Sequence, residues 1–117
     1  MTLLTIEDVK NELGIDLVKA KGDFAQSWIN SQVDEVLFYI GQFAYGGYPQ
    51  ALRMLEDDYK KGIIRKATLK HIEYLATNNF VEPDNIITRK GQEYNTGIAI
   101  RARELLLASG LLFCGRY

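Results

Sequence analysis

The apolar positions of this chain recur at helical spacing over most of its length. Near the start, Ile6, Val9 and Leu13 fall at three- and four-residue intervals and therefore share one helix face. Thr5 places a hydroxyl where an N-cap is needed, and Gly14 follows the last apolar position. The pattern predicts a short amphipathic helix in this segment.

A longer helix is predicted from about Phe24 to Tyr45, after a small connector and with Asp23 as its cap. Gly41 within this helix costs about 1 kcal/mol relative to Ala, which close approach of another backbone would offset. The core-facing positions follow 4-4-3-4-3 spacing and are Ala25, Ile29, Val33, Val36, Ile40 and Phe43.

The middle of this helix departs from simple amphipathicity, because five consecutive positions are apolar or aromatic on every side. A helix of this kind must be buried on more than one face, by its own domain or by a neighbouring subunit. The five candidate interface residues are Val36, Leu37, Phe38, Tyr39 and Ile40.

The second half of the chain predicts further helices and one irregular segment. After the break at residues 46–49, a shorter helix runs over residues 50–58, with Gly62 as a candidate interruption before a helix that ends near Thr77. Residues 80–97 predict an irregular loop or small hairpin, and a last helix runs from about Ile98 to Ser109. The fold class expected is all-α: a compact bundle of four to five helices in one domain, residues 1–117.

Residues 110–117 form an apolar chain end that should not hang in water. Gly110 is a natural C-cap for the last helix, and the side chains after it are mainly apolar. This tail either packs back on the domain or docks on something else, and its candidate docking residues are Leu111, Leu112, Phe113, Arg116 and Tyr117.

Composition narrows the class of protein. The 117 residues are 47% hydrophobic with two prolines, which excludes a disordered or Pro-rich chain. One cysteine cannot form an intramolecular disulfide, and one histidine cannot form a His-rich metal site. No apolar run approaches the roughly 18 to 20 residues that span a bilayer, so we expect no membrane contact and assembly in the cytoplasm.

The net charge of −1 conceals an uneven distribution along the chain. Residues 1–58 carry four basic and ten acidic residues, whereas residues 59–117 carry ten basic and five acidic ones. Asymmetry of this kind can indicate a partner or a self-complementary assembly.

Candidate catalytic chemistry is weak. The sequence contains no nucleophile elbow, phosphate-binding loop, zinc-protease motif or calcium loop, so neither an enzyme nor a bound cofactor is expected. A packed, hydrogen-bonded role is favoured for His71 over a general base, and a buried apolar role for Cys114 over a nucleophile. The acidic run at residues 56–58 points about 100° apart at each step, which favours a solvated edge over a metal site.

One basic group remains as a candidate for contact with the DNA backbone: Lys61, Arg65, Lys66 and Lys70. On a helix these residues form two i, i+4 pairs and therefore a basic strip. The alternative is an ordinary solvated helix face, because no recognition motif accompanies the strip.

The order of features resembles that of the head-to-tail connector proteins of tailed bacteriophages, also called adaptor or head-completion proteins. The resemblance rests on Thr5-Ile6-Glu7-Asp8-Val9-Lys10 in the opening helix, the long second helix, the basic and apolar residues 63–69, and the final Arg101 to Tyr117. The aromatic corner at residues 43–48 and the long connector at residues 80–97 depart from that pattern.

The resemblance implies a structural protein of the virion neck with no enzymatic activity. It implies a homo-oligomeric ring of about a dozen copies that docks on the portal, partly through the C-terminal region, and receives stopper or tail proteins. The ring would extend the DNA channel, so DNA would pass through it without sequence readout. The alternative function is a small helical DNA-binding regulator that uses Lys61, Arg65, Lys66 and Lys70 on phosphates.

Overall fold

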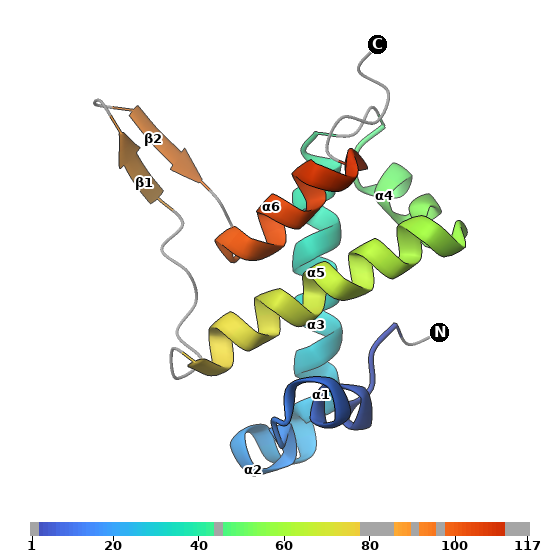
Figure 1. Cartoon of the computed structure of the whole chain (residues 1–117), viewed down its shortest axis with the longest axis vertical. Helices are drawn as coiled ribbons and strands as arrows, with labels where there is room; N and C mark the ends of the chain where they lie inside the picture. The colour runs from blue at the N-terminus through green and yellow to red at the C-terminus, as the bar shows by residue number, and fades with distance from the viewer. Residues whose placement is uncertain (1–2, 44–45, 78–85, 90–91, 96–97, 112–117) are drawn as a thin grey trace.

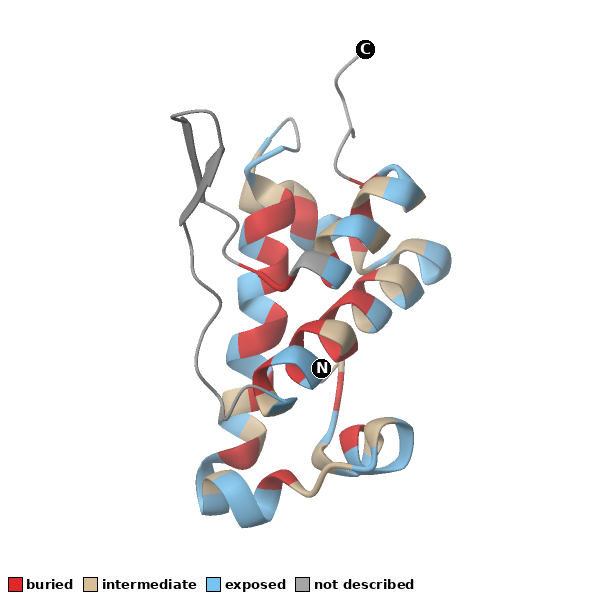
Figure 2. Cartoon of the chain, turned by 60° about the vertical axis from the view of Figure 1, so that its left-hand side comes forward, coloured by how far each residue is buried: buried red, intermediate tan, exposed pale blue. Residues whose placement is uncertain are grey.

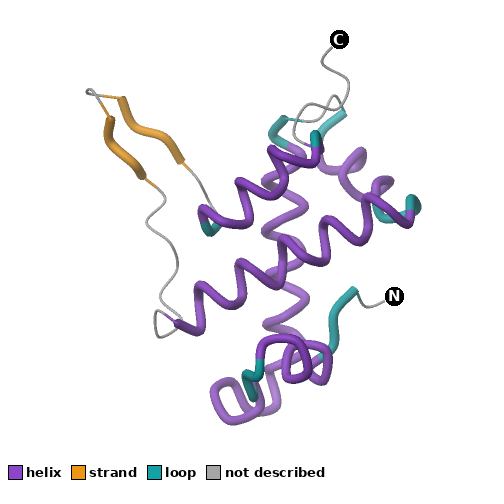
Figure 3. The backbone as a smooth tube through the Cα atoms, in the orientation of Figure 1, coloured by secondary structure: helices purple, strands orange, loops and turns teal. Residues whose placement is uncertain are grey.

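The computed structural model of the chain is a helical bundle with a small β-hairpin beside it (Figures 1 and 3). It describes residues 3–43, 46–77, 86–89, 92–95 and 98–111. Five helices of seven or more residues lie within these ranges, which confirms the all-α class. They are α1 (Ile6–Leu13), α3 (Ala25–Gly41), α4 (Tyr48–Met54), α5 (Asp58–Thr77) and α6 (Ile100–Ser109).

Helix α1 has the termini that the sequence predicts. The Thr5 hydroxyl accepts a hydrogen bond from the Asp8 backbone N–H at 3.1 Å, and the Asp8 carboxylate accepts one from the Thr5 N–H at 3.0 Å. These two bonds form a capping box, which satisfies N–H groups that have no partner within the helix. Gly14 ends the helix with φ +71°, a conformation that glycine adopts without strain.

The predicted connector between the first two helices is partly helical. Residues Leu17–Lys21 form a one-turn helix, α2, whose cap is Asp16: its Oδ1 accepts a hydrogen bond from the Val18 N–H at 3.1 Å. A 3₁₀ turn, η1, follows over Gly22–Phe24 and contains Asp23. Asp23 is therefore not the cap of the long helix, which begins at Ala25 without a side-chain cap.

The connection from α3 to α4 begins earlier in the chain than the sequence predicts. Helix α3 ends at Gly41 rather than near residue 45, and α4 begins at Tyr48 with Pro49 in its first turn. A Cβ on Gly41 would lie 2.8 Å from the backbone nitrogen of Tyr48, closer than real contacts allow. The close backbone approach expected at Gly41 is thus confirmed, and its partner is the start of α4.

Helix α5 is continuous over 20 residues, so the interruption considered at Gly62 is wrong. One glycine costs only about 1 kcal/mol in a helix, and the beginning of α5 is held by Asp57. Its Oδ1 accepts hydrogen bonds from the backbone N–H groups of Tyr59 at 2.9 Å and Lys60 at 3.2 Å. Helix α6 begins at Ile100, because the residue before it, Ala99, has an extended backbone.

The segment between α5 and α6 contains the hairpin, where the sequence predicts an irregular loop or a small hairpin. Strands β1 (Ile86–Arg89) and β2 (Gln92–Asn95) pair antiparallel, with Ile86 opposite Asn95 and Arg89 opposite Gln92. In Figure 1 the two strands stand beside the helices rather than between them. The hairpin therefore adds no layer to the bundle.

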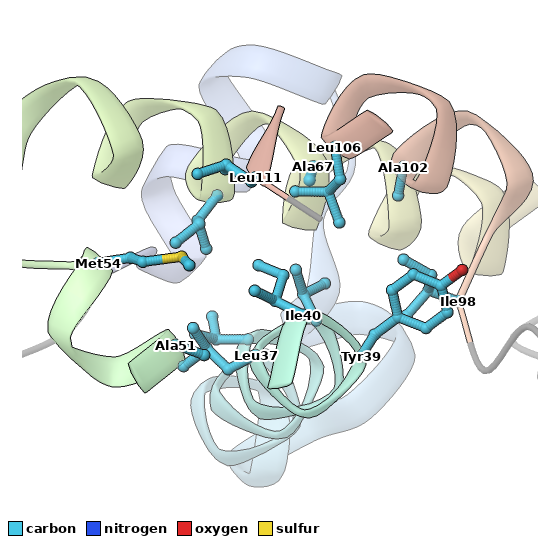
Figure 4. Close-up of a cluster of buried hydrophobic side chains, with 13 residues drawn as sticks. Leu37, Tyr39, Ile40, Ala51, Met54, Ala67, Ile98, Ala102, Leu106 and Leu111 are labelled. Carbon is cyan, nitrogen blue, oxygen red and sulfur yellow. The ribbon is translucent and has the colours of Figure 1, made fainter. Parts of the chain in front are cut away.

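Two clusters of buried side chains hold the helices together, and α3 and α5 contribute to both (Figure 2). The smaller cluster joins α1 and α2 to the first half of α3 and consists of Leu4, Val9, Leu17, Ala25, Ile29, Leu69 and Ile72. The main cluster joins the second half of α3 to α4, α5 and α6 (Figure 4). It consists of Val33, Val36, Leu37, Tyr39, Ile40, Ala51, Met54, Ile64, Ala67, Ile98, Ala102, Leu106 and Leu111.

Candidate interaction surfaces

A stacked aromatic pair, in which Phe38 is exposed and Tyr48 is partly buried, lies where α3 meets α4. The Phe38 side chain is 53% exposed, and its ring stacks on the ring of Tyr48 with 4.3 Å between centroids and 22° between planes. Leu52, one helical turn after Tyr48, is exposed as well. We call Phe38, Tyr48 and Leu52 the aromatic surface.

The aromatic surface is held in place by the turn between the two helices. The short distance at Gly41 brings the start of α4 against α3, which sets Tyr48 beside Phe38. The Tyr48 hydroxyl then donates a hydrogen bond to Asp34 Oδ1 at 3.2 Å. Burial, followed by the charge and hydrogen bond of Asp34, raises the pKa of Tyr48, so the hydroxyl keeps its proton at neutral pH.

The five candidate interface residues of α3 divide into two groups. Val36, Leu37, Tyr39 and Ile40 are buried in the main cluster of their own chain, and only Phe38 is exposed. The apolar segment does need burial on more than one side, but α4, α5 and α6 provide it (Figure 4). The surface offered to a second chain is therefore Phe38 together with its neighbours on α4.

The candidate docking tail is described only at its first residue. Leu111 is 2% exposed and packs in the main cluster, so it belongs to the core of the domain. At this one residue the chain packs back on the domain. Leu112, Phe113, Arg116 and Tyr117, like Cys114, lie outside the described residues.

The four basic candidates do not form one strip. Arg65 faces α1, where its guanidinium pairs with the carboxylates of Glu12 and, at 3.8 Å, Asp8. The hydrogen bond to Glu12 is the main reason that the pKa of Arg65 is raised. Lys61 and Lys70 are partly buried, and Lys66 is exposed. Arg65 is thus already engaged by two carboxylates, whereas Lys66 and Lys70 line a common groove.

Lys66 and Lys70 lie at a groove across the outer side of α5, with a volume of about 440 Å³. We call it the α5 groove. Three apolar side chains, one each from α1, α5 and α6, line it together with four charged ones. The apolar residues are Leu13, Leu69 and Leu105, and the charged ones are Glu12, Lys66, Lys70 and Glu73.

A second hollow, of about 540 Å³, adjoins the α5 groove and shares Lys70 and Glu73 with it. Its other lining residues come from the end of α5 and the beginning of α6, and they include Tyr74, Arg101 and Glu104. This hollow is lined by two acidic and two basic side chains, as is the α5 groove, so neither has the uniformly basic lining that favours contact with a phosphate backbone.

His71 is a buried structural histidine, as the sequence analysis favours. Its Nδ1 accepts a hydrogen bond from the Ala99 N–H at 3.0 Å, and its Nε2 lies 3.1 Å from Gln32 Oε1. Because Nδ1 accepts, the proton of the neutral ring is on Nε2 and is donated to Gln32. Burial lowers the pKa of His71 to about 4. The ring connects α3, α5 and the beginning of α6, and it is 2% exposed.

The acidic run at residues 56–58 serves the beginning of α5, because Asp57 caps the helix and Asp58 is its first residue. Among the residues that the structure describes, no group of three or more His, Cys, Asp or Glu is placed to hold a metal ion. Within the same ranges, no helix has both the length and the apolar character needed to cross a membrane.

The contacts of Gln26 and of Tyr48 were not predicted from the sequence. Gln26 fixes the segment before α1, since its amide accepts a hydrogen bond from the Ile6 N–H at 3.2 Å and donates one to the Leu4 carbonyl at 2.9 Å. The sequence placed Tyr48 in the break between two helices and did not predict its contacts with Phe38 and Asp34. A usable signal was present for the aromatic surface: Phe38 is the one aromatic residue of the 36–40 segment that lies opposite the core stripe.

No family model, curated protein or solved structure matches the chain.

Proposed function

We propose that this chain is a structural protein of a tailed bacteriophage: a head-to-tail connector that forms a ring, docks on the portal and extends the DNA channel towards the tail. It would act at the virion neck after assembly in the host cytoplasm, without catalysis and without a cofactor. Its partners would be further copies of itself, the portal protein, and stopper or tail proteins.

The observation that carries the proposal is the aromatic surface. The exposed ring of Phe38 stacks on the ring of Tyr48, which is partly buried against the main cluster, and Leu52 extends the apolar area along α4. An apolar area of this kind on a small domain favours contact with another protein. The helical fold and the resemblance in the order of sequence features support the same function.

The portal contact is assigned to residues 112–117. Leu111 is committed to the core, so a docking segment begins after it. Arg116 and the aromatic Phe113 and Tyr117 are residue types that are enriched at protein interfaces.

The test uses the full chain and the portal protein encoded by the same genome. We expect the assembled portal ring to retain the chain, and electron micrographs to show an added ring on the portal. A variant that ends after Leu111 should lose this retention while its thermal unfolding stays unchanged. Failure of the full chain to bind the portal ring would contradict the proposal, whatever oligomer the chain forms alone. The position of the gene directly after portal and capsid genes is a second, independent expectation.

The alternative function, a helical DNA-binding regulator, receives less support because Arg65 is engaged by Glu12 and Asp8. Contacts through Lys66 and Lys70 alone would give a salt slope of about −2 in a plot of log K against log salt concentration. Fluorescence anisotropy with a DNA duplex at low salt measures this slope. Tight binding that is lost in a Lys66→Gln, Lys70→Gln double variant would favour the regulator over the connector.

A further inference from the structure

The aromatic surface and the α5 groove lie on opposite sides of the molecule. The molecule measures 44 × 38 × 20 Å, and Figure 1 views it along the shortest dimension, with α5 crossing in front of α3. Helices α3 and α5 thus form two layers, and each turns one side towards the other layer and one side outwards.

Phe38 lies on the outer side of α3. It is two residues from both Val36 and Ile40, which are completely buried, and two residues correspond to about 200° round a helix. Lys66 is related in the same way to Ile64 on α5, and Ile64 is also completely buried. The side chains of Phe38 and Lys66 therefore leave the two layers in opposite directions.

The α5 groove has the size and lining to receive an aromatic side chain. Its volume of about 440 Å³ lies within the roughly 300–1,000 Å³ of pockets that hold small molecules. Leu13 and Leu105 are partly exposed in the groove, Leu69 is 7% exposed there, and four charged side chains share the lining. Apolar and polar side chains also occur together in protein interfaces.

Helices α3 and α5 carry net charges of opposite sign, whereas the lining of the α5 groove itself holds two lysines and two glutamates, of which Glu12 pairs with Arg65. Helix α3 carries two acidic residues and no basic ones, whereas α5 carries five basic and two acidic residues. Asp34 is one turn before Phe38, and the hydrogen bond from Tyr48 holds its carboxylate there. Lys66 and Lys70 stand at the groove that an aromatic residue would enter.

We propose that the aromatic surface of one copy of this chain docks in the α5 groove of the next copy, with Phe38 in the groove and Asp34 near Lys66 and Lys70. The occupant is a second copy because one chain carries both complementary surfaces on opposite sides. A contact between two different surfaces propagates from copy to copy and closes into a ring when the rotation allows. The inference deepens the proposed function, because it assigns the contact from which a connector ring would be built.

Disulfide cross-linking tests which surfaces meet. In a Cys114→Ser background, Gln42→Cys places a thiol one turn from Phe38, and Lys66→Cys places one at the groove. We expect a disulfide-linked dimer when the two single-cysteine variants are mixed, and little dimer from either variant alone. A mixture of Phe24→Cys with Lys66→Cys is the control, because Phe24 is exposed at the far end of α3.

Self-association measured by sedimentation equilibrium up to about 1 mM gives the strength of the contact. Phe38→Ser should weaken it at least tenfold, whereas Phe24→Ser, also a change of an exposed phenylalanine, should not. Asp34→Lys should weaken it too, and Lys66→Glu in the same chain should restore part of the loss. Circular dichroism establishes that each variant is folded.

Two results would overturn the inference: absence of the mixed dimer at about 1 mM protein, or cross-linking of Gln42→Cys with itself. Failure of the connector proposal can be distinguished from failure of this contact. A chain that binds the portal ring without the mixed disulfide would retain the proposed function and refute this contact. A chain that forms the mixed disulfide but never binds a portal ring would support this contact and refute the proposed function.

Discussion

His71 is 2% exposed and is the least exposed titratable residue among those that the structure describes. It is surrounded by α3, α5 and the beginning of α6, and each ring nitrogen has a hydrogen-bond partner. Every other buried side-chain nitrogen or oxygen among the described residues has a partner as well. Neutral His71 makes both hydrogen bonds. A proton added at Nδ1 would break the hydrogen bond from the Ala99 N–H.

His71 should therefore make the protein sensitive to mild acid. Its pKa is about 4 in the folded chain and about 6.5 in the unfolded chain, so the unfolded state takes up the proton first. Its contribution to the free energy of unfolding is constant above about pH 6.5 and falls by about 3 kcal/mol as the pH drops to about 4. Urea unfolding at a series of pH values measures this loss.

The control for this prediction is His71→Gln, which removes the titrating group and keeps one hydrogen-bonding side chain. The variant should be less stable at pH 7, and its free energy of unfolding should depend less on pH between 6.5 and 4. An unchanged pH dependence in the variant would show that carboxylates, not His71, cause the acid sensitivity.

Two helical glycines provide a matched pair. Ala at position 41 would place its Cβ 2.8 Å from the Tyr48 backbone, whereas a Cβ on Gly62 would meet nothing within 4 Å. We expect Gly41→Ala to lower the free energy of unfolding by roughly 1–3 kcal/mol, as overpacking does. Gly62→Ala should raise it by about 0.5–1 kcal/mol through helix propensity. Thermal or urea unfolding of both variants measures the difference, and equal effects would contradict the close approach at Gly41.

At the scale of the elements, α1 is attached to the rest of the bundle by polar contacts as well as by its apolar side. Arg65 on α5 pairs with Glu12 and Asp8, and Gln26 on α3 binds the backbone on either side of residue 5. A helix of eight residues is too short to be stable alone. These contacts therefore determine where α1 lies once the apolar side is buried.

The pairing between Arg65 and Glu12 should be measurable by a double-mutant cycle. Both side chains are partly exposed, so a coupling free energy of about 0.5–1 kcal/mol is expected from Arg65→Gln, Glu12→Gln and the double variant. Because screening weakens exposed ion pairs, the coupling should be smaller in 1 M salt. A coupling near zero would indicate that Arg65 is available to other partners, including DNA.

At the scale of the whole molecule, the two buried clusters should behave as one cooperative unit. Helices α3 and α5 run through both clusters, so loss of either cluster exposes apolar side chains on both helices. Met54→Ala in the main cluster and Leu17→Ala in the smaller one should each lower the free energy of unfolding by about 2–5 kcal/mol.

Both core variants should still unfold in a single transition. Circular dichroism and the fluorescence of Trp28, which packs against the smaller cluster, should give the same midpoint for each variant. A variant in which Trp28 fluorescence changes before the helical signal would show that the smaller cluster unfolds separately.

The fold was predictable where local sequence decides the structure. The capping residue Thr5, the terminating Gly14 and the apolar spacing of α3 depend on neighbours within a few residues, so the existence and type of these helices were readable. The end of α3 at Gly41 and the beginning of α6 after Ala99 were not, because each lies at a contact with another segment, Tyr48 and His71 respectively. The continuity of α5 through Gly62 was not predicted either, because one glycine lowers helix propensity without ending a helix. The buried role of His71 was predicted, but its partners Gln32 and Ala99 were not.

The sequence by itself determined the helical class, the near absence of candidate catalytic chemistry and the surplus of apolar residues around Phe38. The tertiary structure decided which of those residues is exposed, since helical period alone does not tell how many sides of α3 are covered. It also decided that Arg65 faces α1 while Lys66 and Lys70 face the α5 groove. Periodicity gives the direction of a side chain around its own helix, but only the packing of the other helices determines what it meets.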